Sequence, residues 1–201
     1  MALPRVYPVV DDARWIERLV PLGVRLVQLR VKEAAGAQLR RQIRAAKQCC
    51  DRAGAKLIVN DHWRAALEEG CDFVHLGQGD LDDADLPALR RARVRLGVST
   101  HDPAELERAL ACRPDYVALG PIYPTLLKAM PWAPQGLGRI REWKARLGAI
   151  PLVAIGGLTV ARLPGVFGAG ADAAAVVTDI VRHADPEART LEWLRAAEAA
   201  A

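Results

Sequence analysis

Short apolar runs recur along the whole chain, and longer segments that mix polar and apolar positions separate them. The runs are about five residues long and rich in Val, Leu, Ile and Ala, which is typical of buried β-strands. They read as nearly continuous apolar segments, so the pattern favours a sheet that is covered on both faces. We expect strands over residues 6–10, 26–30, 57–60, 73–77, 95–100, 116–121, 152–157 and 173–178.

Amphipathic segments fill the intervals, so strand and helix alternate. The clearest lie over residues 37–53, where Gly54 follows as a C-cap, and over residues 103–111. A phrase of Gly, a short turn and a strand recurs in GVRLVQLR, GAKLIVND, GCDFVHLG and GADAAAVV. The recurrence predicts repeated βα units that close into a single-domain (β/α)8 TIM barrel over residues 1–201. An open doubly wound sheet is the alternative, but no GxGxxG follows the first strand.

Residues 120–140 interrupt this alternation. The segment holds four prolines and has no obvious helix in its first half. Long irregular connections inside a domain are usually lids or binding loops, so we expect an active-site loop at 120–140.

The charge balance and the cysteines narrow the class of protein. The 201 residues carry 28 Lys and Arg against 24 Asp and Glu, a mild excess that suits an anionic ligand. Acidic residues are interspersed among the basic clusters and no aromatic platform accompanies them, which disfavours nucleic acid as a partner. The four cysteines form no CxxC pair, and neither a signal sequence nor a membrane-length apolar run is present. We therefore expect a cytoplasmic protein without a membrane partner.

Polar residues gather where the predicted strands end, which is where the chemistry of a (β/α)8 barrel lies. Alternation puts Gln28, Arg30 and Lys32 on one face of their strand, and two cations in the barrel mouth would need an anion. A solvated strand end is the alternative. Polar residues at other strand ends are Asn60, Asp61, His75, Gln78, Asp80, Ser99, Thr100, His101, Tyr123, Thr125, Lys128 and Thr178.

Asp61 and Asp80 follow adjacent strands and offer the oxygen ligands that Mg²⁺ prefers. A helix cap at Asp61 and an Asx turn at Asp80 are the structural alternatives. Gly156-Gly157 and Val177-Thr178 fit the phosphate site that barrels build from backbone N–H groups, although a bare Gly pair also suits a tight turn. The histidines have no metal-ligand spacing, so we expect them to be hydrogen-bonded structural residues.

Together these residues resemble the thiamine-phosphate synthase family, and the similarity runs along nearly the whole chain. The signatures that carry it are YPVVDD, QLRVK, IVNDHW, VHLGQGDL, LGVSTHD, ALGPIYPT followed by Lys128, MPWAPQGL, VAIGGL and AVVTDI. The resemblance implies a transferase that joins 4-amino-5-hydroxymethyl-2-methylpyrimidine diphosphate to 4-methyl-5-(2-phosphoethyl)thiazole, or its carboxylated form, and releases diphosphate. By analogy it also allows a homo-oligomer.

The resemblance also implies roles for individual residues. Arg30, Lys32 and Lys128 would be catalytic, because they stabilise the charge that develops on the leaving diphosphate. Asp61 and Asp80 would bind Mg²⁺. The pyrimidine diphosphate would contact Gln28, Leu29, Arg30, Val31, Lys32, Asn60, Ser99 and Lys128. The thiazole phosphate would lie against Thr125, Leu127, Gly157, Val177 and Thr178.

The aminopyrimidine can stabilise the cation left when diphosphate departs, so the natural mechanism is a dissociative substitution without a covalent nucleophile. Three positions depart from the family pattern. Leu127 stands where the family usually has a threonine, Gly79 replaces a frequent acidic residue, and Thr178 replaces a serine. A related thiazole tautomerase is one alternative, although Pro121 stands where those enzymes carry a histidine. A barrel that binds thiamine precursors without catalysis is another.

Overall fold

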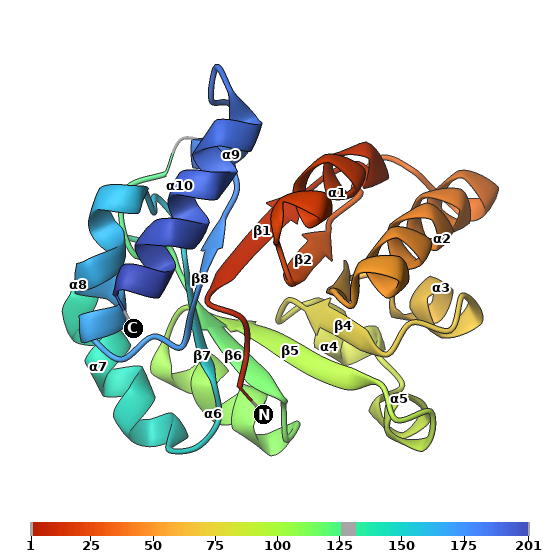
Figure 1. The fold of residues 1–201 in the computed structure, drawn as a ribbon. Coiled ribbons are helices and arrows are strands. Elements are labelled where there is room, and N and C mark those ends of the chain that lie inside the picture. Colours follow the sequence, from red (N-terminus) through yellow and green to blue (C-terminus); the bar gives the residue numbers. More distant parts are fainter. Residues whose placement is uncertain (1, 126–131, 201) are drawn as a thin grey trace.

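Eight parallel strands close into a barrel in chain order, from β1 paired with β2 round to β8 paired with β1. The structure, a computed structural model, describes residues 2–125 and 132–200. The strands are β1 (Val6–Val10), β2 (Leu26–Leu29), β3 (Lys56–Asn60), β4 (Phe73–Leu76), β5 (Arg95–Thr100), β6 (Tyr116–Leu119), β7 (Leu152–Ile155) and β8 (Ala173–Val176). Figure 1 shows the red β1 beside the blue β8, where the two ends of the sheet meet.

Helices follow the strands and pack around the outside of the barrel. The α-helices are α1 (Ala13–Leu19), α2 (Gly36–Ala53), α3 (Trp63–Glu68), α4 (Asp80–Asp83), α5 (Leu86–Arg91), α6 (Pro103–Ala111), α7 (Gly136–Leu147), α8 (Leu163–Gly168), α9 (Thr178–Val181) and α10 (Pro186–Ala199). Two 3₁₀ turns, η1 (Val20–Leu22) and η2 (Val160–Arg162), complete the described elements.

The fold predicted from the sequence is confirmed, and the strand positions agree within two residues. The differences fall mainly at the carboxyl ends of strands, where the chain leaves the ladder to enter the cavity mouth. The predicted helix at 37–53 begins one residue earlier, and Gly54 caps it in the left-handed conformation, as expected. The loop predicted at 120–140 runs into α7 at Gly136, and residues 126–131 lie outside the described residues.

Local sequence explains where several helices begin. Asp12, Asp85, Asp102 and Asp185 each precede a helix, and the side chain of each accepts a hydrogen bond from a backbone N–H of the first turn. Such caps satisfy donors that have no partner inside the helix and stabilise it by about 1 kcal/mol each.

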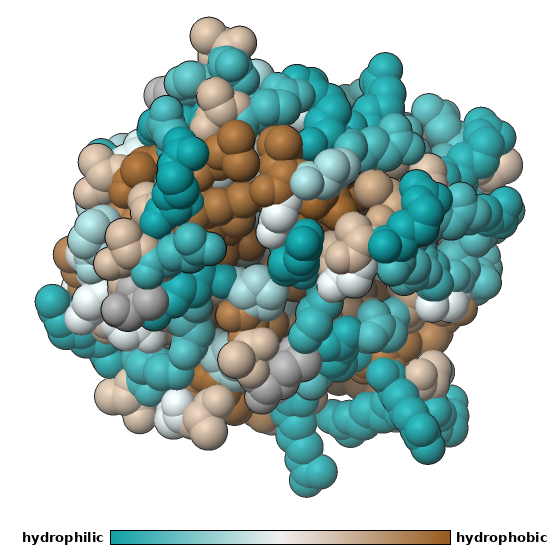
Figure 2. Space-filling model, viewed as in Figure 1, coloured by the Kyte–Doolittle hydropathy of each residue, from teal (hydrophilic) through white to brown (hydrophobic). Residues whose placement is uncertain are grey.

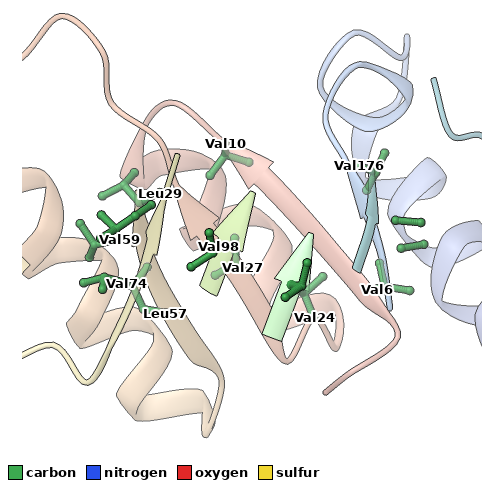
Figure 3. Close-up of a cluster of buried hydrophobic side chains, with 14 of the residues drawn as sticks. Val6, Val10, Val24, Val27, Leu29, Leu57, Val59, Val74, Val98 and Val176 are labelled. Atoms are coloured by element: carbon green, nitrogen blue, oxygen red, sulfur yellow. The ribbon is translucent and has the colours of Figure 1, made fainter. Parts of the chain in front are cut away.

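The core has two layers, because successive side chains of a strand point alternately outward and inward. The outer layer packs the strands against the helices, and Figure 3 shows Leu29, Val59 and Val74 of adjacent strands in it. The inner layer fills the barrel with aromatic side chains of β1, β4 and β6, and with alanines of β6 and β8. The aromatic members are Tyr7, Phe73 and Tyr116.

Gly97 makes room for the largest inner side chain. A Cβ atom at this position would lie 2.2 Å from ring carbons of Tyr116, so only glycine fits opposite the ring. Tyr116 is therefore held in one orientation inside the barrel, against Phe73 in an edge-on contact with ring centroids 5.6 Å apart.

Hydrophilic residues cover most of the face seen in Figure 1, and hydrophobic residues gather near its upper centre (Figure 2). No helix among the described residues has both the length and the apolar character needed to cross a membrane. The four cysteines are free thiols, three of them buried.

Candidate active site

A cavity of about 1210 Å³ opens at the carboxyl ends of the strands. This is the end of a (β/α)8 barrel where active sites lie. Most of the site residues predicted from the sequence line it, namely Gln28, Arg30, Val31, Lys32, Asn60, Asp61, Asp80, Ser99, Thr125, Gly157, Val177 and Thr178. The topology therefore brings together residues that are far apart in the chain.

The three other predicted residues are Leu29, Leu127 and Lys128. The side chain of Leu29 is buried in the outer layer between barrel and helices, so only its backbone could meet a ligand (Figure 3). Leu127 and Lys128 lie outside the described residues. Their assigned roles stay predictions.

The end of β2 presents Gln28, Arg30 and Lys32 to the cavity, as the alternation predicts. Gln28 is buried within the barrel, whereas Arg30 and Lys32 follow the last residue of the strand. Val31 also lines the cavity, and its carbonyl oxygen lies 2.8 Å from Nε2 of His62. This contact ties the segment after β2 to the segment after β3.

Asp61 and Asp80 form a pair of neighbouring carboxylates. Burial, the negative charge of Asp80 and a hydrogen bond with that carboxyl raise the pKa of Asp61 to about 6, whereas Arg30 acts in the opposite direction. Asp61 also has a left-handed backbone with φ of 59°, which is uncommon outside glycine and better tolerated by Asp than by most residues. The arrangement crowds negative charge at one point of the cavity wall.

This donor set suits a hard cation. Each carboxylate offers oxygen ligands, and a bound divalent ion would offset the negative charge of Asp80 that, after burial, raises the pKa of Asp61. Asp80 is held in place by the backbone N–H of Gly77, which donates to its Oδ2 at 3.1 Å. No group of three or more His, Cys, Asp or Glu side chains within residues 2–125 and 132–200 could hold a metal. The remaining ligands would be water or substrate oxygens, as Mg²⁺ commonly retains.

Neither structural alternative for the two aspartates describes this arrangement. The residue that caps α3 is His62 rather than Asp61, and no side-chain hydrogen bond caps that helix. The Asp80 side chain accepts a hydrogen bond from the backbone N–H of Gly77, three residues earlier. An Asx turn would instead use an N–H that follows Asp80.

A chain of buried hydrogen bonds crosses the floor of the cavity. Nε2 of Gln28 donates to the Tyr7 hydroxyl at 2.7 Å, the hydroxyls of Tyr7 and Tyr116 lie 2.8 Å apart, and Tyr116 lies 2.6 Å from Nδ1 of His75. Nε2 of His75 lies 2.7 Å from Oγ of Ser99. We call these five residues the buried relay.

Burial keeps the relay uncharged. Desolvation, helped by the nearby charge of Arg30, lowers the pKa of His75 to about 3. Desolvation also raises the pKa values of Tyr7 and Tyr116 well above their usual range. At neutral pH, therefore, each member can only donate or accept hydrogen bonds.

On the opposite side of the cavity, the segment after β7 lies in close contact with the backbone of the loop after β6. A Cβ at Gly156 would lie 2.6 Å from Cα of Pro121, and one at Gly157 would lie 2.5 Å from the carbonyl oxygen of Pro124. Both glycines have positive φ, so the pair after β7 can pack under the loop that follows β6. Backbone N–H groups at the start of α9 have no partner within that helix, so Val177 and Thr178 stand beside donors suited to an anion.

Sequence reasoning missed several residues of the site. Tyr7 and Tyr116 lie inside predicted strands, where an aromatic residue reads as core, and nothing in the sequence indicated that their hydroxyls meet. Arg182 lines the cavity just after α9. No signal in the sequence indicated it, because it lies four residues beyond the end of the last predicted strand. The histidines all make hydrogen bonds, as expected, but those of His75 reach into the cavity floor.

Comparisons with known proteins agree with one another. The family model described as thiamine monophosphate synthase matches residues 6–180. A curated thiamine-phosphate synthase of Rhizobium etli is 61% identical over 98% of this chain and 96% of that protein. One of Neisseria meningitidis is 46% identical over 92% of this chain and 90% of the relative.

Among solved structures, a thiamine phosphate pyrophosphorylase of Pyrococcus furiosus matches with a TM-score of 0.86 and 23% identity, covering 98% of this chain and 96% of that one. A structure described as native KDPGal matches with a TM-score of 0.78 and 15% identity, over 100% of this chain and 97% of the other. At these identities the structural matches show the shared barrel.

Proposed function

Since this chain belongs to the thiamine monophosphate synthase family and is itself a thiamine-phosphate synthase, we propose that its cavity joins an aminopyrimidine diphosphate to a thiazole phosphate. The substrates would be 4-amino-5-hydroxymethyl-2-methylpyrimidine diphosphate and 4-methyl-5-(2-phosphoethyl)thiazole or its carboxylated form, and the products thiamine phosphate and diphosphate. The observation that carries the proposal is that the cations Arg30 and Lys32, the neighbouring carboxylates Asp61 and Asp80, and the polar floor line one cavity.

The side of the cavity formed after β2–β5 suits the pyrimidine diphosphate. Arg30 and Lys32 supply positive charge at the mouth, while Gln28 and Ser99 lie deeper at the two ends of the buried relay. An aminopyrimidine needs both an acceptor and a donor, and its diphosphate needs cations. We therefore place the ring on the relay and the diphosphate toward Arg30, Lys32 and Lys128.

We further propose that Asp61 and Asp80 would hold Mg²⁺, because the two neighbouring carboxylates line the cavity and offer the oxygen ligands that this ion prefers. When bound, the ion supplies positive charge that stabilises the departing diphosphate. Arg30, Lys32 and Lys128 add fixed positive charge to the same leaving group. The dissociative route needs no protein nucleophile, so the residues act by positioning and by charge.

The side formed after β6–β8 suits the thiazole phosphate. Gly157, Val177 and Thr178 would offer backbone N–H groups, and Thr125 and Thr178 would offer hydroxyls. The exposed Arg182 lies at the same rim and could add one charge. Leu127, in place of the family threonine, would contribute no hydroxyl.

The direct experiment incubates the purified protein with both substrates and Mg²⁺, with a matched sample in EDTA. Thiamine phosphate and diphosphate are measured together over time. Metal-dependent formation of both products in equal amounts is the expected result. Tight binding of the pyrimidine diphosphate without product would contradict the proposed reaction and favour a binding role.

We also propose that the protein works in the cytoplasm, since its four cysteines are free and three are buried. Association into a homo-oligomer stays a prediction that sedimentation of the purified protein would test.

A further inference from the structure

Two residues of the buried relay, Tyr7 and Tyr116, have no role in the proposed reaction. Tyr116 is fully buried beneath the cavity, and it is not among the residues that line it. Its hydroxyl contacts the Tyr7 hydroxyl and the His75 ring. Tyr116 can therefore influence a ligand only through its neighbours in the relay.

The hydrogen bonds of the relay have one consistent direction. The amide nitrogen of Gln28 donates to Tyr7, so the oxygen of Tyr7 is an acceptor at that contact. The hydrogen of Tyr7 must then point to Tyr116, which is the other partner of this hydroxyl in the described part of the chain. The opposite choice would leave the Tyr7 hydrogen buried without an acceptor, at a cost of about 1–3 kcal/mol.

The same reasoning fixes the remaining bonds. Because Tyr116 accepts from Tyr7, its own hydrogen points to Nδ1 of His75 at 2.6 Å. A neutral imidazole carries a single hydrogen, so His75 bears it on Nε2 and donates to Oγ of Ser99. Burial lowers the pKa of His75 to about 3, which keeps the ring in this neutral form.

Both ends of the relay face the cavity with a defined polarity. The amide nitrogen of Gln28 is committed to Tyr7, so its oxygen remains to accept from a ligand. The oxygen of Ser99 accepts from His75, so its hydroxyl hydrogen remains to be donated. The Gln28 oxygen complements an N–H donor and the Ser99 hydroxyl complements an acceptor, and an aminopyrimidine offers both kinds of group.

We propose that Tyr7 and Tyr116 are positioning residues that set the direction of the relay, so that the cavity prefers an aminopyrimidine to its oxo analogue. The oxo form presents a carbonyl acceptor where the amino form presents a donor, and it would meet the Gln28 oxygen unfavourably. The choice of ligand rests on the proposed function. The direction of the relay rests on the orientation of the Gln28 amide toward Tyr7 and does not depend on the proposed function.

The first measurement uses the ligand-free protein. Long-range ¹H–¹⁵N spectra of protein labelled at its four histidines report which ring nitrogen carries the hydrogen, and His75→Gln identifies the His75 signals. We expect hydrogen on Nε2 and a hydrogen-bonded, unprotonated Nδ1. Hydrogen on Nδ1 would reverse the relay and overturn the proposal, whether or not the protein makes thiamine phosphate.

The second measurement compares affinities for two unreactive ligands, the aminopyrimidine monophosphate and its 4-oxo counterpart. Because we compare the ratio of the two Kd values, a loss of affinity that a variant shows equally for both ligands does not change the result. We expect the wild-type protein to prefer the amino compound by about 10² or more, since an unmatched buried polar group is penalised strongly. Equal affinities, or a preference for the oxo compound, would contradict the proposed polarity.

Two tyrosine variants separate the halves of the relay. In Tyr116→Phe, Tyr7 can turn to donate to Gln28, so we expect the preference to fall by about tenfold and the Nδ1 signal to lose its hydrogen-bond shift. In Tyr7→Phe, the Gln28 amide loses its anchor while the bond from Tyr116 to His75 remains. The preference should again fall by about tenfold, with the Nδ1 signal unchanged.

A matched control removes a buried hydroxyl elsewhere. Thr190 is fully buried in α10, and its Oγ1 donates to the carbonyl of Pro186 at 2.8 Å. Thr190→Val should preserve both the His75 signals and the Kd ratio. If both tyrosine variants also preserve the ratio, the tyrosines serve packing alone and the proposal is wrong. If the wild-type spectra and ratio are as expected but the protein forms no product, the relay stands and the proposed reaction fails.

Discussion

The two sides of the cavity rim are built by different means. After β2–β5 the rim consists of charged and polar side chains, including Arg30, Asp61, Asp80 and Ser99, and we call it the side-chain rim. After β7 the chain places Gly156 and Gly157 directly against the loop that follows β6, and we call these glycines with the residues around Val177 and Thr178 the glycine rim. One barrel end thus holds ligands by charge on one side and by backbone contact on the other.

This difference indicates how each rim should respond to substitution. A lost charge on the side-chain rim removes stabilisation of the leaving group, which is greatest in the transition state and lowers turnover. An added Cβ on the glycine rim displaces backbone and disturbs the placement of a substrate. We expect the side-chain rim to govern kcat and the glycine rim to govern the KM of the thiazole.

The largest effect is expected for Asp80→Ala. Loss of one of the two proposed Mg²⁺ ligands should lower turnover by about 10²–10³ and move the Mg²⁺ concentration for half-maximal rate upward. The measurement is the steady-state rate over a Mg²⁺ titration. Asp83→Ala is the matched control, because Asp83 is an exposed residue of the same short helix. Near-wild-type turnover in Asp80→Ala would contradict the assignment of a Mg²⁺ site to the side-chain rim.

Lys128 tests whether charge also acts from the loop that precedes the glycine rim. The residue lies outside the described residues, and its role rests on the family motif. We expect Lys128→Ala to lower kcat by about 10² with a smaller change in the thiazole KM. Lys47→Ala, at a half-buried position of α2 where Lys47 pairs with Asp51, provides the control. If Lys128→Ala changes only the thiazole KM, Lys128 binds substrate and does not stabilise the leaving group.

His75, in the buried relay beneath the side-chain rim, should make the free energy of unfolding depend on pH. His75 has an ordinary pKa near 6.5 and a native pKa of about 3, so below pH 6.5 the unfolded chain binds a proton that the native chain does not. The free energy of unfolding should therefore fall by up to about 1.4 kcal/mol per pH unit between pH 6.5 and 3, and this contribution should be complete above pH 6.5.

Urea unfolding of wild type and His75→Gln at a series of pH values isolates this contribution. The difference in slope between the two proteins should appear below pH 6.5. His183→Gln removes an exposed histidine from the segment before α10 and serves as the control. Parallel curves for wild type and His75→Gln would mean that folding does not lower the pKa of His75.

Gly157→Ala should act mainly on the other rim. The added Cβ would lie 2.5 Å from the carbonyl oxygen of Pro124, and φ of 64° is strained for alanine. We expect the thiazole KM to rise by about tenfold and stability to fall by about 1–3 kcal/mol, with a smaller change in kcat. Gly138→Ala is the control, since a Cβ there meets nothing within 4 Å. A fall in kcat alone would contradict the division of labour between the rims.

The sequence predicted the barrel and the side-chain rim better than it predicted the buried relay and the loop contacts of the glycine rim. Strand ends are visible as polar residues after apolar runs, so the sequence alone indicates Arg30, Lys32, Asp61 and Asp80. The relay could not, because the meeting of Tyr7 with Tyr116 depends on barrel closure and on the space left by Gly97. The contact between Gly157 and Pro124 is likewise a property of two loops that only the fold brings together.

The smallest effect is expected where this chain departs from its family. Leu127 stands where a threonine is usual, and a hydroxyl there would add one hydrogen bond to the thiazole phosphate, a contact of about 0.5–1.5 kcal/mol. Leu127→Thr should therefore lower the thiazole KM by about threefold to tenfold and leave the pyrimidine KM unchanged. Leu126→Thr introduces the same hydroxyl one residue earlier and is the control. If Leu127→Thr changes nothing, the glycine rim already satisfies the phosphate with its backbone N–H groups, and the contrast between the two rims becomes sharper.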